Sequence, residues 1–288
     1  MRPQSNRVLF CRSAGGVPGL DVHVGIWRAL QEAGIRSTAN TGCSAGAIIA
    51  AMDSLGRGPE GWEVILRHLR DEDVREERPL WKLRMPWIRY FLLHDPIRKL
   101  IEKYFGKITA LEKPTTIYAT REYDACSAAF SIQAADPQRR IEILLASMSI
   151  PGVFPPVKFS PLSSPYSDGG TTNYLAIPSD WNTYDEVWLL IANPPYEYEP
   201  KEESMLSRLL MNVHISLEHQ IREDLGTLLE AAPNCRPRIH VIRPDCGKDA
   251  GVLRFDHSLI DEAYKQTKKL LEGESRAHAS LVELRRAG

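Results

Sequence analysis

Three glycine-rich stretches of this chain contain the residue types that acyl transfer requires. They are SAGGVPG at residues 13–19, GCSAG at residues 42–46 and SDGG at residues 167–170. Ser44 supplies a hydroxyl that can attack a carbonyl carbon, and Asp168 supplies a carboxylate that can accept the hydroxyl proton. The amides of Gly15 and Gly16 can donate to the oxyanion of a tetrahedral intermediate, and one such donor is typically worth about 3 kcal/mol. Together the three stretches supply what acyl transfer requires.

Ser44 lies in the pattern Gly-x-Ser-x-Gly, which is formed by Gly42, Cys43, Ser44, Ala45 and Gly46. The pattern is typical of a nucleophile elbow, in which a strand turns sharply into a helix and glycines remove side chains that would clash. Because Gly and Ser are common residues, the pattern arises by chance in roughly one chain in ten of this length. On the pattern alone, Ser44 in a tight connection without a catalytic role is an alternative explanation.

The two other stretches also have ordinary explanations when each is considered alone. Glycines after strands are most often turn residues, and Asp168 followed by Gly169 is a common turn dipeptide. The chemical interpretation requires that the stretches meet in space. In a parallel sheet, the turns that follow the strands lie along one edge, where ligands bind. A sheet of this kind would bring the three stretches together.

The first fifth of the chain predicts such a sheet. The apolar run at residues 8–11 predicts a buried strand, and apolar residues at helical spacing predict a helix from Asp21 to a cap at Gly34. A second strand is expected at residues 37–41, followed by a helix at residues 44–55. Two successive strand–helix units favour a mostly parallel sheet covered by helices.

Later segments continue this alternation. Strands are predicted at residues 115–120, 129–132, 186–192 and 238–242, helices at residues 141–148, 205–229 and 259–284, and a short strand or turn at Tyr166 and Ser167. Residues 57–113 differ, because they are helical, charged and interrupted by prolines. No linker-like run divides the 288 residues. We therefore expect one domain over residues 1–288, with a helical cap at about residues 57–113.

Composition limits the classes of function and location. Charged residues make up 25% of the chain and the net charge is −1, which argues against binding of nucleic acid or anionic lipid through bulk electrostatics. Five scattered cysteines indicate reduced thiols in the cytoplasm, and no cluster has the spacing of a metal or other cofactor site. No run of about 18 apolar residues predicts a membrane-spanning helix, so membrane contact is expected to be peripheral.

The segment PLWKLRMPWIRYFLL, residues 79–93, combines aromatic and aliphatic side chains with Lys82, Arg84 and Arg89. One interpretation is a helical cap whose apolar face covers the core. The other is a lid or interfacial segment that places aromatic rings at the lipid boundary and basic groups near the headgroups. The second interpretation would give an acyl chain an apolar route to Ser44.

Over its whole length the chain resembles the patatin-like phospholipases, which are serine acyl hydrolases with a Ser-Asp dyad on a three-layer α/β/α fold. The resemblance rests on the glycine-rich loop before a helix, TGCSAGA at residues 41–47, HDPIRKLI at residues 94–101 and the strand TTIYATREYD at residues 115–124. Its most specific part is ASMSIPGVFPPVKFSPLSSPYSDGGTTNYLAIP at residues 146–178. There the connection IPGVFPPV is followed by an aromatic residue and then by Asp-Gly-Gly.

The resemblance implies a mostly parallel central sheet between helices, and hydrolysis of acyl esters of lipids without a metal or cofactor. It implies that Ser44 is the nucleophile, that Asp168 is the base, and that Gly15 and Gly16 lie in the oxyanion-hole loop. The structural residues of these motifs would be Gly19, Gly42, Cys43, Gly46, Gly169 and Gly170. Without a histidine, Asp168 must accept the proton directly, which favours a partly buried carboxyl whose pKa is raised by desolvation.

One loop departs from the pattern of the family. Where the family usually has Gly-Gly-Gly-x-Arg/Lys-Gly, this chain has AGGVPG at residues 14–19. Ala14 restricts φ at the first position, and Pro18 replaces a cation that could attract an anionic substrate. The amides of Gly15 and Gly16 remain, so we expect an intact oxyanion hole without the cation that would favour phosphate-bearing substrates.

Two other functions fit parts of the sequence. An α/β-hydrolase with a Ser-His-Asp triad needs a histidine after the serine, and His240 or His257 could fill that role. That fold places several strands before its elbow, whereas only two short ones fit before Ser44. The other alternative is a catalytically inactive lipid-binding or scaffold protein on the same fold, although both dyad residues are present.

Overall fold

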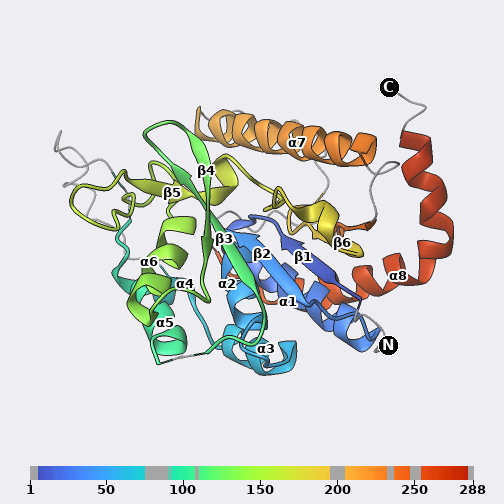
Figure 1. The fold of residues 1–288 in the computed structure, drawn as a ribbon, viewed down its shortest axis with the longest axis horizontal. Coiled ribbons are helices and arrows are strands. Elements are labelled where there is room, and N and C mark those ends of the chain that lie inside the picture. The colour runs from blue at the N-terminus through green and yellow to red at the C-terminus, as the bar shows by residue number, and fades with distance from the viewer. Residues whose placement is uncertain are drawn as a thin grey trace.

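The described residues contain a sheet of seven strands at the centre of the protein in the computed structural model (Figure 1). The structure describes residues 6–74, 90, 92–107, 110–194, 205–231, 237–246 and 254–284, with the backbone alone for 205–214 and 274–284. The strands are β1 (Val8–Arg12), β2 (Ala39–Cys43), β3 (Thr115–Arg121), β4 (Cys126–Ser131), β5 (Tyr166–Asp168), β6 (Glu186–Leu190) and β7 (Arg238–Ile242). Their order is β4-β3-β2-β1-β6-β7, and β5 pairs with β3 outside this path.

Most of the sheet is parallel, as predicted. Strand β1 pairs in parallel with β2 and β6, β2 with β3, and β6 with β7. Strands β4 and β5 are both antiparallel to β3. The parallel strands therefore place the carboxyl ends of β1, β2 and β6 at one edge of the sheet, where their following turns can meet.

Helices cover the sheet. They are α1 (Gly16–Glu32), α2 (Ala45–Asp53), α3 (Pro59–Leu66), α4 (Asp71–Val74), α5 (Asp95–Phe105), α6 (Pro137–Ser147), α7 (Met205–Ala231) and α8 (Ser258–Leu284), with short 3-10 helices at Gly169–Thr171 and Trp181–Thr183. Within the described part of the chain, none of them is both long enough and apolar enough to span a bilayer.

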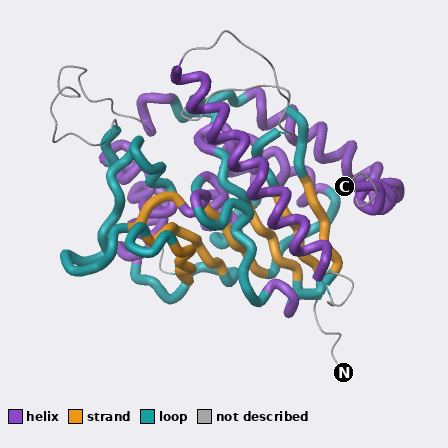
Figure 2. Tube along the Cα trace, turned by 90° about the horizontal axis from the view of Figure 1, so that it is seen from above, coloured by secondary structure: helices purple, strands orange, loops and turns teal. Residues whose placement is uncertain are grey.

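The side chains of β1 alternate between two buried faces, as a period of two residues requires. On one face, Phe10 packs with side chains from α1 and α8. On the other, Leu9 and Cys11 share a cluster with Ile221 and Leu228 of α7. Figure 1 shows α7 on the opposite side of the sheet from α1, and in Figure 2 it crosses over the strands. The fold is therefore the predicted three-layer α/β/α arrangement.

The start of α1 differs from its prediction. The helix expected from Asp21 begins at Gly16, because the glycine loop itself forms the first helical turn. Pro18 is tolerated there, since the amides of a first turn have no partner within the helix. The apolar periodicity marks only the part of the helix that packs on the core. The predicted end at Gly34 agrees with the structure, where this residue has a φ of +78°.

Other boundaries shift for local reasons. Strand β7 occupies the predicted residues 238–242, whereas β4 begins at Cys126 instead of residue 129. Helix α6 begins at Pro137 instead of residue 141. Its start is fixed by Asp136, whose side chain accepts a hydrogen bond from the amide of Arg139 at 2.9 Å.

The described part of residues 57–113 is helical, as predicted, and it packs directly on the main core. Trp62 of α3 stacks on Phe105 of α5 with 6.1 Å between the ring centroids. Both side chains belong to the same buried cluster as Ile117 of β3. The proposed lid or interfacial segment at residues 79–93 lies outside the described residues except for 90, 92 and 93. The division into one domain with a cap, and the role of this segment, stay predictions.

Helices α1 and α8 approach closely at Gly25, where a Cβ atom would lie 2.3 Å from the carbonyl oxygen of Ile260 and 2.8 Å from the Cβ of Ala263. We expect Gly25→Ala to force the helices apart and to lower the free energy of unfolding by about 1–3 kcal/mol. Urea denaturation measures this change. Gly61→Ala in α3 is the control: nothing lies within 4 Å of a Cβ there, so it should be neutral or stabilising by up to ~1 kcal/mol. Equal losses from both substitutions would contradict the expectation.

Candidate active site

Ser44 occupies the junction between β2 and α2, with a φ of 52° and a ψ of −125°. A positive φ places the Cβ of a non-glycine residue in steric conflict with its own backbone. Ser44 is also buried, with an exposure of 5%. The chain therefore holds this serine in a strained conformation at the end of a strand.

The glycines beside Ser44 are required by close backbone approach. A Cβ on Gly42 would lie 2.4 Å from the carbonyl oxygen of Gly46. A Cβ on Gly46 would lie 2.3 Å from the carbonyl oxygen of Arg12. Any side chain at either position would push α2 away from β1 or β2, so both glycines allow the sharp turn at Ser44.

Strand β3 brings Asp168 to the same point. In the register of the sheet, Tyr118 lies opposite Cys43 at the end of β2, and the next residue, Ala119, lies opposite Asp168 at the end of β5. Strands β2 and β5 therefore pair with successive parts of β3, β2 up to Tyr118 and β5 from Ala119 onward. The structure therefore places Asp168 beside the junction that carries Ser44.

The carboxyl group of Asp168 is buried and only partly hydrogen-bonded. Its Oδ1 accepts a hydrogen bond from the amide of Gly170 at 2.8 Å. Burial raises its pKa to about 6, and the nearby Ser44 hydroxyl and the Gly170 amide, which favour the charged form, oppose this rise. Among the described residues, Oδ2 has no hydrogen-bond partner. The Ser44 hydroxyl is thus near the carboxyl without completing a bond of normal geometry, which is common for catalytic pairs without substrate.

Two serines at and just after the end of α6 accept hydrogen bonds from the backbone amides of Ser44 and Asp168. The amide of Ser44 donates to the Oγ of Ser147 at 3.0 Å, and that hydroxyl donates to the carbonyl of Tyr118 at 2.6 Å. The amide of Asp168 donates to the carbonyl of Ser149 at 2.8 Å. Sequence reasoning did not identify these serines as part of the site. Their only signal is their position within the stretch ASMSIPGVFPP.

The glycine loop after β1 presents free amides. The amide of Ala14 donates to the carbonyl of Tyr174 at 3.1 Å. In contrast, no hydrogen bond is made by the amides of Gly15 and Gly16 within the part of the chain that the structure describes. Gly16 is the first residue of α1, whose positive end carries these amides. The loop can therefore stabilise a negative charge.

The three glycine-rich stretches meet in the structure. A Cβ on Gly170 would lie 2.7 Å from the Cβ of Ala14, and a Cβ on Gly169 would lie 2.9 Å from the Cβ of Cys43. Gly19 faces Ala45, since a Cβ on Gly19 would lie 3.3 Å from the Ala45 Cβ. The serine, the carboxyl group and the free amides thus belong to one contiguous region at the carboxyl edge of the sheet.

The histidines considered for a triad have other partners. The ring nitrogens of His257 lie 3.0 Å from Asp21 Oδ1 and 3.0 Å from the carbonyl oxygen of Leu69. The ring of His240 stacks on Trp188 with 4.0 Å between the centroids. These partners are not members of the candidate dyad. No group of three or more potential ligands that could hold a metal ion occurs among the described residues.

A model of the patatin-like phospholipase family matches residues 13–179, which is more than half of the 288 residues. The chain therefore belongs to the patatin-like phospholipase family. A comparison with curated proteins finds no match.

Three solved structures are similar to this chain to different degrees. VipD from Legionella pneumophila is similar with a TM-score of 0.50 and 12% identity, over 94% of this chain and 67% of VipD. The type III effector ExoU has a TM-score of 0.39 and 14% identity, over 94% of this chain and 53% of ExoU. The ExoU–SpcU complex of Pseudomonas aeruginosa has a TM-score of 0.33 and 15% identity, over 99% and 62%. The chain thus spans between about half and two thirds of these proteins, and the similarity to VipD supports the three-layer fold.

The strain at Ser44 can be measured by comparing two substitutions. Glycine adopts a positive φ without a Cβ conflict, whereas alanine retains the conflict. We expect Ser44→Gly to have a free energy of unfolding about 1 kcal/mol higher than Ser44→Ala, after the entropic cost of glycine. Parallel urea titrations give the difference. If Ser44→Ala were the more stable variant, the junction would not be strained.

Proposed function

We propose that the protein hydrolyses acyl esters of lipids with a dyad of Ser44 and Asp168, through an acyl-enzyme. The observation that carries the proposal is the register of β3, which puts a buried carboxyl group beside a serine on a strained strand–helix junction. This junction has the features of a nucleophile elbow. The free amides of Gly15 and Gly16 would form the oxyanion hole.

The reaction follows from these positions. Ser44 Oγ attacks the ester carbonyl carbon as its proton passes to Asp168, and the carbonyl oxygen becomes an oxyanion held by the Gly15 and Gly16 amides. When the carbon–oxygen ester bond breaks, Asp168 returns the proton to the leaving alcohol, and the acyl group remains on Ser44. Water then attacks the acyl-enzyme and gives its proton to Asp168. Ser44 recovers that proton as the fatty acid leaves.

The environment of Asp168 suits a base that works without histidine. A carboxyl group of ordinary pKa is too weak a base to take a proton from serine, and burial raises the pKa of Asp168 to about 6. At neutral pH the group is still ionised, so it can accept the proton. Its free Oδ2, within the described structure, gives the proton an acceptor atom.

Apolar side chains packed beyond Ser44 along α2 suit a lipid substrate. They come from α1, α2, α3, α4 and α5 and surround a narrow cavity of about 30 Å³. Ile48 lies one turn of α2 beyond Ser44, and Met148 follows Ser147, which binds the Ser44 amide. An acyl chain attached at Ser44 would have apolar side chains to pack against in this direction. Peripheral contact with a membrane is part of this proposal, because the substrate resides there.

Two observations weigh against the alternatives. A Ser-His-Asp triad needs a histidine whose ring can reach the serine, whereas both nitrogens of His257 have other partners and His240 packs on Trp188. An inactive scaffold would have no need for strain at Ser44. Membership of the patatin-like phospholipase family agrees with lipid acyl hydrolysis.

A fluorophosphonate probe tests the nucleophile directly. We expect the probe to label the wild-type protein and to leave Ser44→Ala unlabelled, because the probe reacts only with an activated hydroxyl. In mixed lipid vesicles, only the wild type should release fatty acids, as measured by mass spectrometry of the products. Folded wild type that is neither labelled nor active would favour the scaffold. A single histidine substitution that abolished labelling without unfolding the protein would favour the triad.

The titration of Asp168 should control the rate. Because its pKa is raised to about 6, kcat/KM on a soluble ester should fall as pH decreases through about 6, where the base becomes protonated. Asp168→Asn should lose at least ~10³-fold in activity at pH 8. A profile that stays flat from pH 5 to 8 would exclude Asp168 as the base.

The same shift affects stability with a defined sign. The folded protein binds the Asp168 proton more tightly than the unfolded chain, so the stability that this proton provides is present below pH ~4 and is lost as pH rises through about 6. Relative to wild type, Asp168→Asn should therefore gain stability as pH rises from 4 to 7, by up to about 3 kcal/mol.

A further inference from the structure

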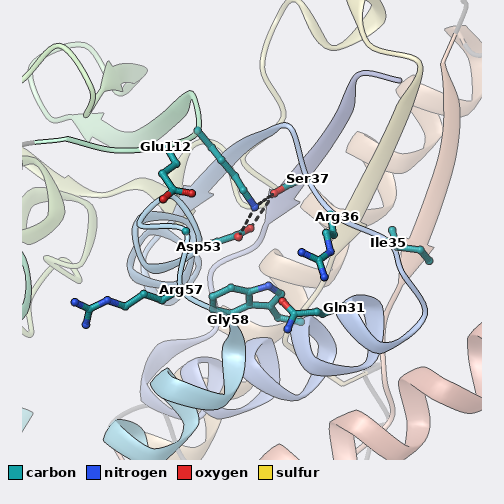
Figure 3. A pocket seen from close by; sticks show the side chains of 11 residues that line it. Gln31, Ile35, Arg36, Ser37, Asp53, Arg57, Gly58 and Glu112 are labelled. Atoms are coloured by element: carbon teal, nitrogen blue, oxygen red, sulfur yellow. Dashed lines mark hydrogen bonds and ion pairs between the residues drawn. The ribbon is translucent and has the colours of Figure 1, made fainter. Parts of the chain in front are cut away.

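A polar hollow of about 260 Å³ lies at the opposite end of α2 from Ser44 (Figure 3). It is bordered by α1, the connection from α1 to β2, the end of α2 and residues 112–113. Asp53, the last residue of α2, lines this hollow, whereas Ser44 directly precedes the first residue of the same helix. The hollow is therefore separate from the candidate active site.

Asp53, which lines the hollow, belongs to a buried cluster of charges with an excess of cations. Asp53 Oδ2 accepts hydrogen bonds from Arg12 Nη2 at 2.8 Å and from Ser37 Oγ at 2.9 Å. Asp53 Oδ1 accepts one from Lys113 Nζ at 2.7 Å, which Figure 3 shows as a dashed line. Burial opposes the ionisation of Asp53, but the neighbouring Arg12 and Lys113 outweigh it and hold its pKa below the ordinary value. Two cations thus face one carboxylate.

Lys113 has a donor left for the hollow, whereas Arg12 lies behind its lining, with the guanidinium carbon 5.5 Å from the centroid of the Trp27 ring. Arg12 is fully buried, and its Nε and Nη1 have no hydrogen-bond partner among the described residues. The ammonium group of Lys113 has three N–H donors, of which Asp53 and Ser37 take two. The Lys113 side chain is 23% exposed, so its third donor can face the hollow. The excess of positive charge, together with the third Lys113 donor, favours an anion in the hollow.

The rim adds two cations, Arg36 and Arg57, and one carboxylate, Glu112. Arg36 and Glu112 line the hollow on opposite sides of Asp53 (Figure 3). Within the described structure, neither side chain has a hydrogen-bond or ion-pair partner. Gly56 leaves space for the carboxylate of Glu112, since a Cβ on Gly56 would lie 2.0 Å from Glu112 Oε2. A matching ligand therefore carries an anion toward Arg36 and a cation toward Glu112.

We propose that this hollow binds a small molecule that carries a phosphate and a primary ammonium group on a short chain. The phosphate contacts Lys113 and Arg36, and the ammonium group contacts Glu112. The volume of about 260 Å³ suits so small a ligand, because pockets for larger organic molecules begin at about 300 Å³. The same chemistry occurs in free aminoalkyl phosphates and in the headgroup of an aminophospholipid.

Calorimetric titration of the full chain with three probes tests the proposal. At constant ionic strength, O-phosphoethanolamine should bind about tenfold more tightly than inorganic phosphate, and ethanolamine should not bind, because the phosphate carries most of the affinity. Arg36→Gln should weaken both phosphate probes about tenfold. Glu112→Gln should reduce the affinity for O-phosphoethanolamine to that for inorganic phosphate. Arg70→Gln, which removes an exposed arginine of the α3–α4 connection, is the matched control and should change nothing.

A vesicle arm distinguishes the two sources of the ligand. The vesicle experiment uses the Ser44→Ala background, which prevents hydrolysis. The ligand is a lipid headgroup if the protein cosediments with phosphatidylethanolamine vesicles but not with phosphatidylcholine vesicles, and if Arg36→Gln abolishes this cosedimentation. Binding of the free probe without such cosedimentation assigns a soluble phosphate. The proposal is wrong if O-phosphoethanolamine binds no better than ethanolamine, or if Arg70→Gln weakens it as much as Arg36→Gln. These outcomes do not depend on whether Ser44 is a nucleophile.

Discussion

The candidate site depends on one constraint, which is that β3 pairs first with β2 and then, further along its length, with β5. Tyr118 lies opposite Cys43 and Ala119 opposite Asp168. Neighbouring strands are about 4.8 Å apart and rise about 3.3 Å per residue, so this register fixes the separation of the serine and the carboxyl group within the reach of their side chains. A slip by one residue would turn Asp168 to the other face of the sheet.

Buried hydrogen bonds protect this register. The hydroxyl of Ser147 links the carbonyl of Tyr118 to the amide of Ser44, and the hydroxyl of Thr120 donates to the carbonyl of Asp168 at 2.8 Å. The Ser147 hydroxyl thus links α6 to both β3 and Ser44, and the Thr120 hydroxyl links β3 to Asp168. They lie at the point along β3 where the pairing with β2 ends at Cys43 and the pairing with β5 starts at Asp168. The positive φ of Ser44 can persist because its surroundings leave the backbone no alternative.

Local signals in the sequence predicted most of the fold and the candidate residues. Short apolar runs marked β1, β6 and β7, and glycines marked the turns that the structure brings together. The placement of Asp168 could not be derived from such signals, because β5 has three residues and no detectable periodicity. The resemblance to a family, carried by residues 146–178, singled out this aspartate. The supporting serines were missed, since serine at the end of a helix is common and carries no chemical signal of its own.

The polar hollow could not be predicted from the sequence either. Arginine is rarely buried in proteins, so an arginine at the end of a predicted strand indicates an exposed end of that strand. The structure gives a reason for the burial of Arg12. The carboxyl end of α2 has a partial negative charge, and Asp53 adds a full one, so cations are needed there. The backbone of Arg12 contacts Gly46 at the start of α2, and its side chain binds Asp53 at the end. One residue thus fixes β1, and the glycine loop that follows it, against both ends of the helix that carries Ser44. Lys113 is a second cation on the same carboxylate. The cluster of Arg12, Lys113 and Asp53 therefore has a net positive charge, and it lies beside the polar hollow at the end of α2 opposite Ser44.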